Sequence, residues 1–203
     1  MNTKLILHTL LPSLRATLVL TALTGVLYPL AVLGAARLLF PHQARGSLVK
    51  DAEGTLVGSS LIGQPFAAPE HFWGRPSTAG GGYDPRASCG SNVTPVSDET
   101  IARVQAERDR LVLANPTAEG PPPLLLVTTS GSGLDPDLSP EAAQWQVPRV
   151  AAARGAAPAE VAALVSEQVV GRTLGVLGEP RVNVLELNLA LDRRFPLRGA
   201  GAR

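Results

Sequence analysis

The sequence predicts an α+β protein with a single N-terminal transmembrane helix followed by one mixed extracytoplasmic domain. Three observations support this fold class. A long uncharged apolar segment lies near the N-terminus. The strand-like and helix-like segments that follow show no regular βαβ alternation. The 203-residue chain is 45% hydrophobic, which suits one globular domain of ordinary size.

The apolar segment contains 21 uncharged residues, 16–36, between Arg15 and Arg37. As a helix it would be about 31 Å long, which matches a hydrocarbon core of roughly 30 Å. A cleaved signal peptide is the alternative, with a small-residue cleavage site at 34–36. We favour an uncleaved anchor because the apolar run is longer than the usual core of a signal peptide.

This anchor divides the chain into a short cytoplasmic N-terminus (1–15), a transmembrane helix (16–36), an extracytoplasmic α+β domain (37–194) and a frayed tail (195–203). Basic residues on the two sides of the helix are nearly balanced, so charge bias alone does not set the orientation. We expect a single-pass protein of the cytoplasmic (inner) membrane with most of the chain on the extracytoplasmic side, which is the commoner arrangement for such anchors.

The first part of the domain combines short strands with a long irregular segment. Residues 46–63 read as strands around turns at Glu53-Gly54 and Gly58-Ser59. Residues 63–95 carry four of the chain's eight aromatic residues, so we expect an ordered loop packed by its own rings. The sequence does not decide whether these rings pack on this domain or on a partner protein.

A helix is predicted to begin after Ser97, a good N-cap, and to stop near Asn115-Pro116. The apolar run 124–127 predicts a short buried strand.

Two further helices are predicted in the C-terminal half. Ser139 and Pro140 begin one, which Pro148 should kink or split and Gly155 should end. Pro158 begins the next.

The last element, residues 182–192, predicts a strand with alternating faces. Leu185, Leu187, Leu189 and Leu191 alternate with Glu186, Asn188, Ala190 and Asp192. We therefore expect Leu187 and Leu189 to face the core and Glu186 and Asn188 to face the wetter side. Val182 and Val184 are out of phase with this pattern, which predicts a bulge near Val184-Leu185.

Several classes of chemistry have no support in the sequence. The net charge of +1 does not indicate nucleic-acid binding, and one cysteine with three scattered histidines does not indicate a disulfide or a metal site. Neither lysine follows a glycine, as a phosphate-binding P-loop requires, and residues 129–133 do not match the nucleophile turn of hydrolases. We therefore predict no catalytic residue and no bound metal.

Six blocks together resemble the KdpC family, the C subunit of the bacterial Kdp potassium-transporting P-type ATPase, in the family's order. They are SLIGQPF (60–66), FWGRPS (72–77), SNVTP (91–95), TSGSGLDPDLSPEAA (129–143), RVAAARG (149–155) and LGEPRVNVLELNLALD (177–192). This chain has Cys89 where the family usually has a glycine. If the backbone at this position has a positive φ, which glycine adopts easily, Cys89 would strain the turn.

The resemblance implies a non-catalytic subunit of an ATP-driven potassium uptake complex. Its implied partners are a channel-like potassium-translocating subunit, a P-type ATPase subunit and membrane lipid. It implies roles in assembling or stabilising these subunits and in raising the ATP affinity of the ATPase subunit. No cofactor is expected on the chain alone, and ATP enters through the complex.

Two segments are candidates for docking a partner or a ligand. One is the aromatic loop around Phe72 and Trp73, which we expect to help hold a complex together, and the other is the loop 128–141. We interpret the loop 128–141 as a structural or docking loop rather than a ligand site, because it is poor in cations and lacks a catalytic base. The alternatives are a membrane-anchored extracytoplasmic serine hydrolase, using Ser130 or Ser132, and a binding protein. The candidate residues are Phe72, Trp73, Arg75, Ser130, Gly131, Ser132, Gly133 and Asp135.

Overall fold

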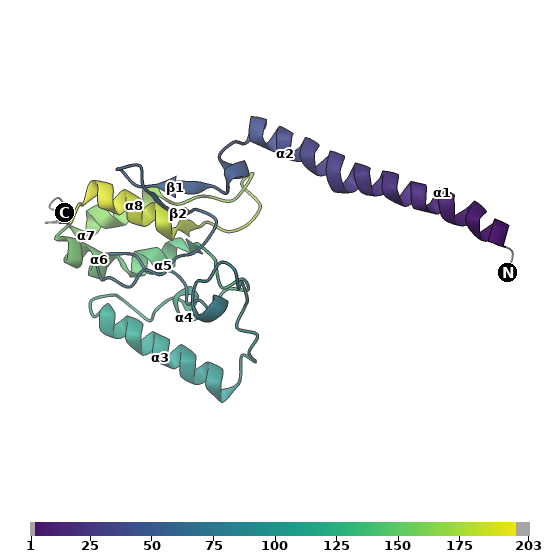
Figure 1. Ribbon diagram of the computed structural model, residues 1–203. Helices are drawn as coiled ribbons and strands as arrows, with labels where there is room; N and C mark the ends of the chain where they lie inside the picture. Colours follow the sequence, from purple (N-terminus) through teal and green to yellow (C-terminus); the bar gives the residue numbers. More distant parts are fainter. Residues whose placement is uncertain (1–2, 198–203) are drawn as a thin grey trace. The chain divides into compact units, whose positions relative to one another are not determined.

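The computed structural model describes residues 3–197, and its contacts divide the chain into two compact units, 1–48 and 49–203. The first unit is mainly one long apolar helix, and the second holds the mixed domain (Figure 1). The predicted α+β composition with one N-terminal apolar helix is therefore confirmed. Of the tail expected over 195–203, residues 198–203 lie outside the described residues, and Phe195 packs against the core of the second unit.

The N-terminal helix consists of α1 (Thr3–Ala22), a π-helical turn η1 (Leu23–Leu27) and α2 (Tyr28–Leu39). The part of this helix from His8 to Leu39 is long and apolar enough to cross a membrane, with a mean hydropathy of 2.0. The wide turn has a local cause: Pro29 lacks an N–H and its ring would crowd the carbonyl four residues earlier. The π turn directly before it relieves that contact. The helix thus extends beyond the predicted 16–36 in both directions.

A short 3₁₀ turn, η2 (Gln43–Arg45), precedes a small sheet formed by β1 (Leu48–Lys50) and β2 (Leu56–Ser59). The turn between these strands forms because the Asp51 carboxylate accepts the backbone N–H of Thr55 at 2.7 Å, and Gly54 takes φ +83°. The strands predicted over 46–63 are confirmed.

The long segment after β2 is irregular, with only a 3₁₀ turn, η3 (Ala79–Gly81), between residues 63 and 95. Helix α3 (Asp98–Ala114) follows as predicted: the Ser97 side chain accepts the Thr100 N–H, and the helix ends at Asn115.

Residues 124–127 are helical, so the predicted strand is wrong there. They form a single turn, α4 (Leu124–Val127), in which the Thr128 hydroxyl donates to the Leu124 carbonyl at 2.8 Å. A run of four apolar residues carries no period that separates a buried strand from a buried helical turn. The side-chain bond from Thr128 closes the turn locally.

The remaining helices form the centre of the domain: α5 (Pro140–Trp145), α6 (Val147–Arg154), α7 (Pro158–Glu167) and α8 (Val184–Arg194). Helix α7 contacts the other three (Figure 1). The predicted signals act as expected. The Ser139 side chain accepts the Ala142 N–H, the chain divides into two helices just before Pro148, and Gly155 ends α6 with φ +63°.

The segment 182–192 is the largest departure from prediction. Only β4 (Val182–Asn183) is a strand, and it pairs antiparallel with β3 (Asp137–Leu138). The expected bulge is in fact a helix start, because the Asn183 side chain accepts the Glu186 N–H at 3.1 Å and caps α8.

The burial pattern of α8 is helical. Positions 184, 187, 188 and 191 are buried, while Leu189 is half-buried and Glu186 exposed. Asn188 is buried, although the strand prediction placed it on the wet face. Leucine, alanine, glutamate and arginine are strong helix formers, and they outweigh the period-2 arrangement of the leucines.

Candidate functional site

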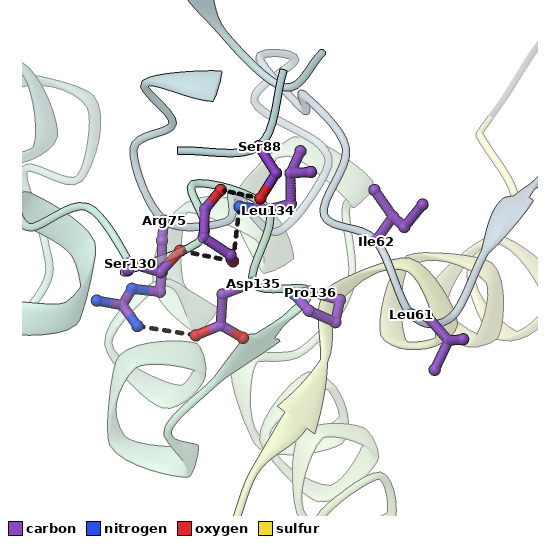
Figure 2. A pocket seen from close by; sticks show the side chains of 10 residues that line it. Leu61, Ile62, Arg75, Ser88, Ser130, Leu134, Asp135 and Pro136 are labelled. Atoms are coloured by element: carbon purple, nitrogen blue, oxygen red, sulfur yellow. Dashed lines mark hydrogen bonds and ion pairs between the residues drawn. The ribbon is translucent and has the colours of Figure 1, made fainter. Parts of the chain in front are cut away.

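Most of the residues predicted to form a site meet around one open pocket. It has a volume of about 540 Å³ and is lined by Leu61 and Ile62 after β2, by Arg75 and Ser88 from the long irregular segment, and by residues between 130 and 136 (Figure 2). Three segments that are distant in sequence therefore build one surface.

Arg75 holds two of these segments together. Its Nη1 lies 2.8 Å from Oδ2 of Asp135 (Figure 2). Its Nη2 donates to the Thr129 carbonyl at 3.1 Å. Its Nε donates to the Thr128 carbonyl at 3.4 Å. The guanidinium is thus bound by its own domain, and Asp135 balances its charge. A phosphate would have to displace these bonds.

Two hydroxyl groups of the pocket, those of Ser132 and Ser88, form hydrogen bonds with the backbone of the loop 128–141. Ser132 Oγ accepts the Leu134 N–H at 3.1 Å and lies 3.4 Å from Ser130 Oγ. Ser88 Oγ donates to the Ser132 carbonyl at 2.9 Å. Neither a histidine nor a lysine lines the pocket as described. Neither serine is therefore placed beside a base that would activate it as a nucleophile.

Glycines allow two backbones to touch behind the pocket. A Cβ on Gly133, which has φ +68°, would lie 2.5 Å from the Cys89 carbonyl oxygen, and a Cβ on Gly90 would lie 2.9 Å from that of Gly131. Cys89 itself does not have a positive φ, so the cysteine at this position does not strain the turn. Its thiol is exposed and donates to the Thr78 carbonyl at 3.2 Å.

Asp137, which follows the pocket residues in sequence, has a carboxyl group whose pKa is raised. Burial raises its pKa, and repulsion from Asp135 adds to the effect. The Arg181 guanidinium, 3.1 Å away, and a hydrogen bond from Asn183 offset part of this increase. Asp137 therefore belongs to the β3–β4 pairing and does not supply a free charge to the pocket.

The predicted site residues thus separate into two groups. Arg75, Ser130, Gly131, Ser132 and Asp135 line the pocket, and Gly133 lies behind it as a spacer.

The two aromatic candidates are elsewhere. Phe72 is fully buried and Trp73 is 7% exposed, both in the hydrophobic core of this domain. Their rings have no free face for a partner, so the expectation that they dock one is corrected. Replacing Trp73 would weaken an assembly only by weakening the domain.

Sequence reasoning missed the side chains that hold these aromatics. Asn188 Oδ1 accepts the Phe72 N–H at 2.8 Å and its Nδ2 donates to the Phe72 carbonyl at 3.0 Å. Gln146 repeats the arrangement on Trp73, at 2.9 and 3.0 Å. Each member of this amide pair, Gln146 and Asn188, therefore binds both the N–H and the carbonyl of one residue in the irregular segment. One sequence signal could have indicated these contacts: each amide side chain lies at a position that faces the core when the segment is read as a helix.

A second pocket of about 500 Å³ contains the His71–Asp192 pair, with Nε2 3.7 Å from Oδ1. Burial raises the pKa of Asp192, but the nearby His71 ring and the Arg154 guanidinium, which donates to Asp192 Oδ1 at 2.7 Å, outweigh it, and the pKa is lowered overall. No serine, threonine or cysteine lines this pocket as described, so the pair has no nucleophile to activate. Within residues 3–197, no group of three or more potential metal ligands comes together.

Comparisons with known proteins give a consistent result. The family model described as "K+-transporting ATPase, c chain" matches residues 10–193. The chain is 60% identical over 187 residues to the potassium-transporting ATPase KdpC subunit of Myxococcus xanthus, covering 92% of this chain and 89% of that protein. It is 54% identical over 185 residues to the same subunit of Caulobacter vibrioides, covering 91% and 93%.

Proposed function

Because the chain belongs to the KdpC family of potassium-transporting ATPase subunits, we propose that it assembles and stabilises the other subunits of a potassium uptake complex. The partners in this proposal are a channel-like potassium-translocating subunit and a P-type ATPase subunit. The chain contributes no catalytic group and acts as an accessory subunit.

The observation that carries this proposal is the unpartnered apolar helix. None of the most apolar window within His8–Leu39 is buried by the rest of the described chain. In water, this helix would expose a continuous apolar surface, which lipid and membrane-embedded subunits can cover. The helix therefore supplies both an anchor and a first contact with the partners.

The effect on ATP affinity is proposed to act through these partners. In this proposal the domain lies on the extracytoplasmic side of the membrane, where it cannot touch cytoplasmic ATP. Any change in nucleotide affinity then has to be a coupling between sites. The engagement of Arg75 with Asp135 and two carbonyls supports this view, because it leaves the pocket with little charge for a triphosphate.

Omission of the chain tests the proposed function. When the other subunits are produced without it, we expect less ATPase subunit to co-purify with the channel-like subunit, lower potassium-stimulated ATPase activity and a higher KM for ATP. Ser130→Ala and Ser132→Ala are the matched controls, since neither serine lies beside a histidine or lysine in the pocket as described, and both variants should retain most of the activity. An equally stable and active complex without the chain would disprove the assembly role.

The orientation of the domain is tested with the single cysteine, Cys89, which is exposed in the second unit. A membrane-impermeant thiol reagent should label it in cells whose outer membrane is permeable and whose inner membrane is intact. Labelling of the unfolded chain controls for shielding by partners. Labelling that requires an opened inner membrane would place the domain in the cytoplasm.

A further inference from the structure

A hairpin between α7 and β4 is not used by the proposed site. It spans residues 170–181 and projects beyond the start of α8 (Figure 1). Val170 and Arg181 exchange both backbone hydrogen bonds, at 2.8 and 3.0 Å, and Thr173 and Leu177 do the same, at 2.8 and 3.0 Å.

The tip of the 170–181 hairpin is a defined turn. The Gly175 N–H donates to the Arg172 carbonyl at 3.0 Å, and Arg172 pairs with Glu179 at 2.7 Å. Leu174 has φ +54°, a region that a leucine rarely adopts because its Cβ crowds the backbone. Glycine or asparagine would fit this position with less strain, so the backbone does not explain the leucine.

The side chains at this tip are apolar and uncovered. Leu174 is 87% exposed, Val176 73% and Leu177 59%. Single exposed apolar residues are ordinary, but three within four residues on an ordered turn form a small apolar knob. Because these side chains are exposed, the knob does not contribute to packing within the domain, and domain stability does not explain its apolar residues.

We propose that this knob, Leu174, Val176 and Leu177, inserts into an apolar recess on another protein subunit of the complex. The inference rests on the proposed function, since it names the surface through which the chain would hold its partners. Membership of a multisubunit family supplies the protein partner.

The chemistry of the tip favours protein over lipid. Segments that bind membrane surfaces combine apolar residues with tryptophan, tyrosine or unpaired basic residues. Residues 173–177 contain none of these, and the adjacent Arg172 is paired with Glu179.

A second copy of the chain is a poorer fit. The two pockets described above carry charged residues, Arg75 and Asp135 in one and Asp192 and Arg193 in the other. An apolar knob that entered either pocket would take water from these charged groups and offer them no new polar partner.

Cross-linking in the intact complex tests the identity of the partner. Cys89→Ser removes the only native thiol, and Leu174→Cys then receives a maleimide carrying a photoreactive benzophenone. Illumination should give a covalent product with another subunit of the complex. Products with lipid or with a second copy alone, or no product, would overturn the proposal.

A charge at the tip tests whether the contact matters. Leu174→Asp and Leu177→Asp should each weaken retention of the chain by the purified complex at least about tenfold, as expected for a buried apolar anchor. Leu113→Asp is the matched control, because Leu113 on α3 is 84% exposed. All three variants should keep the melting transition of the wild-type chain.

The outcome separates this inference from the proposed function. If omission of the chain disrupts the complex but the tip variants are retained like Leu113→Asp, the hairpin proposal fails and the assembly role stands. If omission itself has no effect, the assembly role fails first.

Discussion

The Asn188→Ala substitution is expected to destabilise the domain as much as Leu187→Ala, by about 2–5 kcal/mol each. Glu186→Ala, on the same helix, should change the free energy of unfolding by less than about 0.5 kcal/mol. A strand would give Glu186 and Asn188 the same face and similar effects, whereas the helix α8 separates them.

The large effect at Asn188 has two sources. Its side chain is 2% exposed, so truncation leaves a hole in the core. The change also leaves the N–H and carbonyl of the buried Phe72 without partners, and each unsatisfied group costs about 1–3 kcal/mol. Leu187 has no polar role, and its loss is one of packing in a fully buried position.

Tryptophan fluorescence during urea unfolding of the full chain in mild detergent measures these effects. The only two tryptophans, Trp73 and Trp145, both lie in the second unit, so the signal reports on that unit alone. Asn188→Leu separates the two sources because it fills most of the volume without restoring the hydrogen bonds, and it should remain destabilised. Wild-type stability in Asn188→Ala would contradict the amide contact with Phe72.

The parts of the fold that the sequence predicted are those with local causes. Ser97 and Ser139 cap helices with their own side chains, and Gly155 ends a helix because it can take a positive φ. Each signal acts within four residues, so no knowledge of the tertiary structure is needed to interpret it.

The elements that were predicted wrongly depend on periodicity in segments that fit two periods. Leucines at 185, 187, 189 and 191 alternate, yet the same segment places apolar residues at 184, 187 and 191, which suit a helix. The outcome depends on Asn183, whose side chain caps α8, and on Asn188, whose burial makes sense only beside Phe72.

The candidate site shows the same limit. The composition of the loop after α4 indicated a shaped loop without a base, and the bonds of Ser132 and Asp135 support that interpretation. The ion pair between Arg75 and Asp135 joins residues 60 positions apart, and nothing in the sequence indicates their contact. The burial of Phe72 and Trp73 depends on helices that follow them by more than 70 residues.

Arg149 gives rise to the other large expected effect, because it is a buried cation bonded to neutral oxygens. It is 7% exposed and its guanidinium carbon lies 4.0 Å from the centre of the Trp73 ring. It donates to the side chains of Asn115 and Gln146 at 3.0 and 2.8 Å. It also donates to the carbonyls of Pro69 and His71.

Replacing Arg149 should therefore cost at least about 3 kcal/mol, because several buried acceptors lose their donor at once. Arg149→Met keeps apolar volume beneath Trp73 but donates no hydrogen bond. Arg149→Lys keeps a cation but cannot reach all four oxygens in the planar geometry of a guanidinium. Both variants should unfold at clearly lower urea concentrations than the wild type at pH 7.

The pH dependence of these two variants should differ, and this separates charge from packing. Burial, with repulsion from Arg110, lowers the pKa of Arg149 to about 10, so the folded domain disfavours a charge at this position. A lysine there should have a folded pKa below its usual value of about 10.4. When folding lowers the pKa of a basic side chain, its charged form reduces the free energy of unfolding. This loss of stability disappears as the pH rises through the folded pKa toward the unfolded pKa.

Relative to the wild type, Arg149→Lys should therefore regain stability between about pH 8 and pH 10, while Arg149→Met, which has no titrating group, should keep a constant deficit. Parallel deficits in both variants across this range would show that the core tolerates a lysine charge and that the loss is one of hydrogen bonding and packing alone.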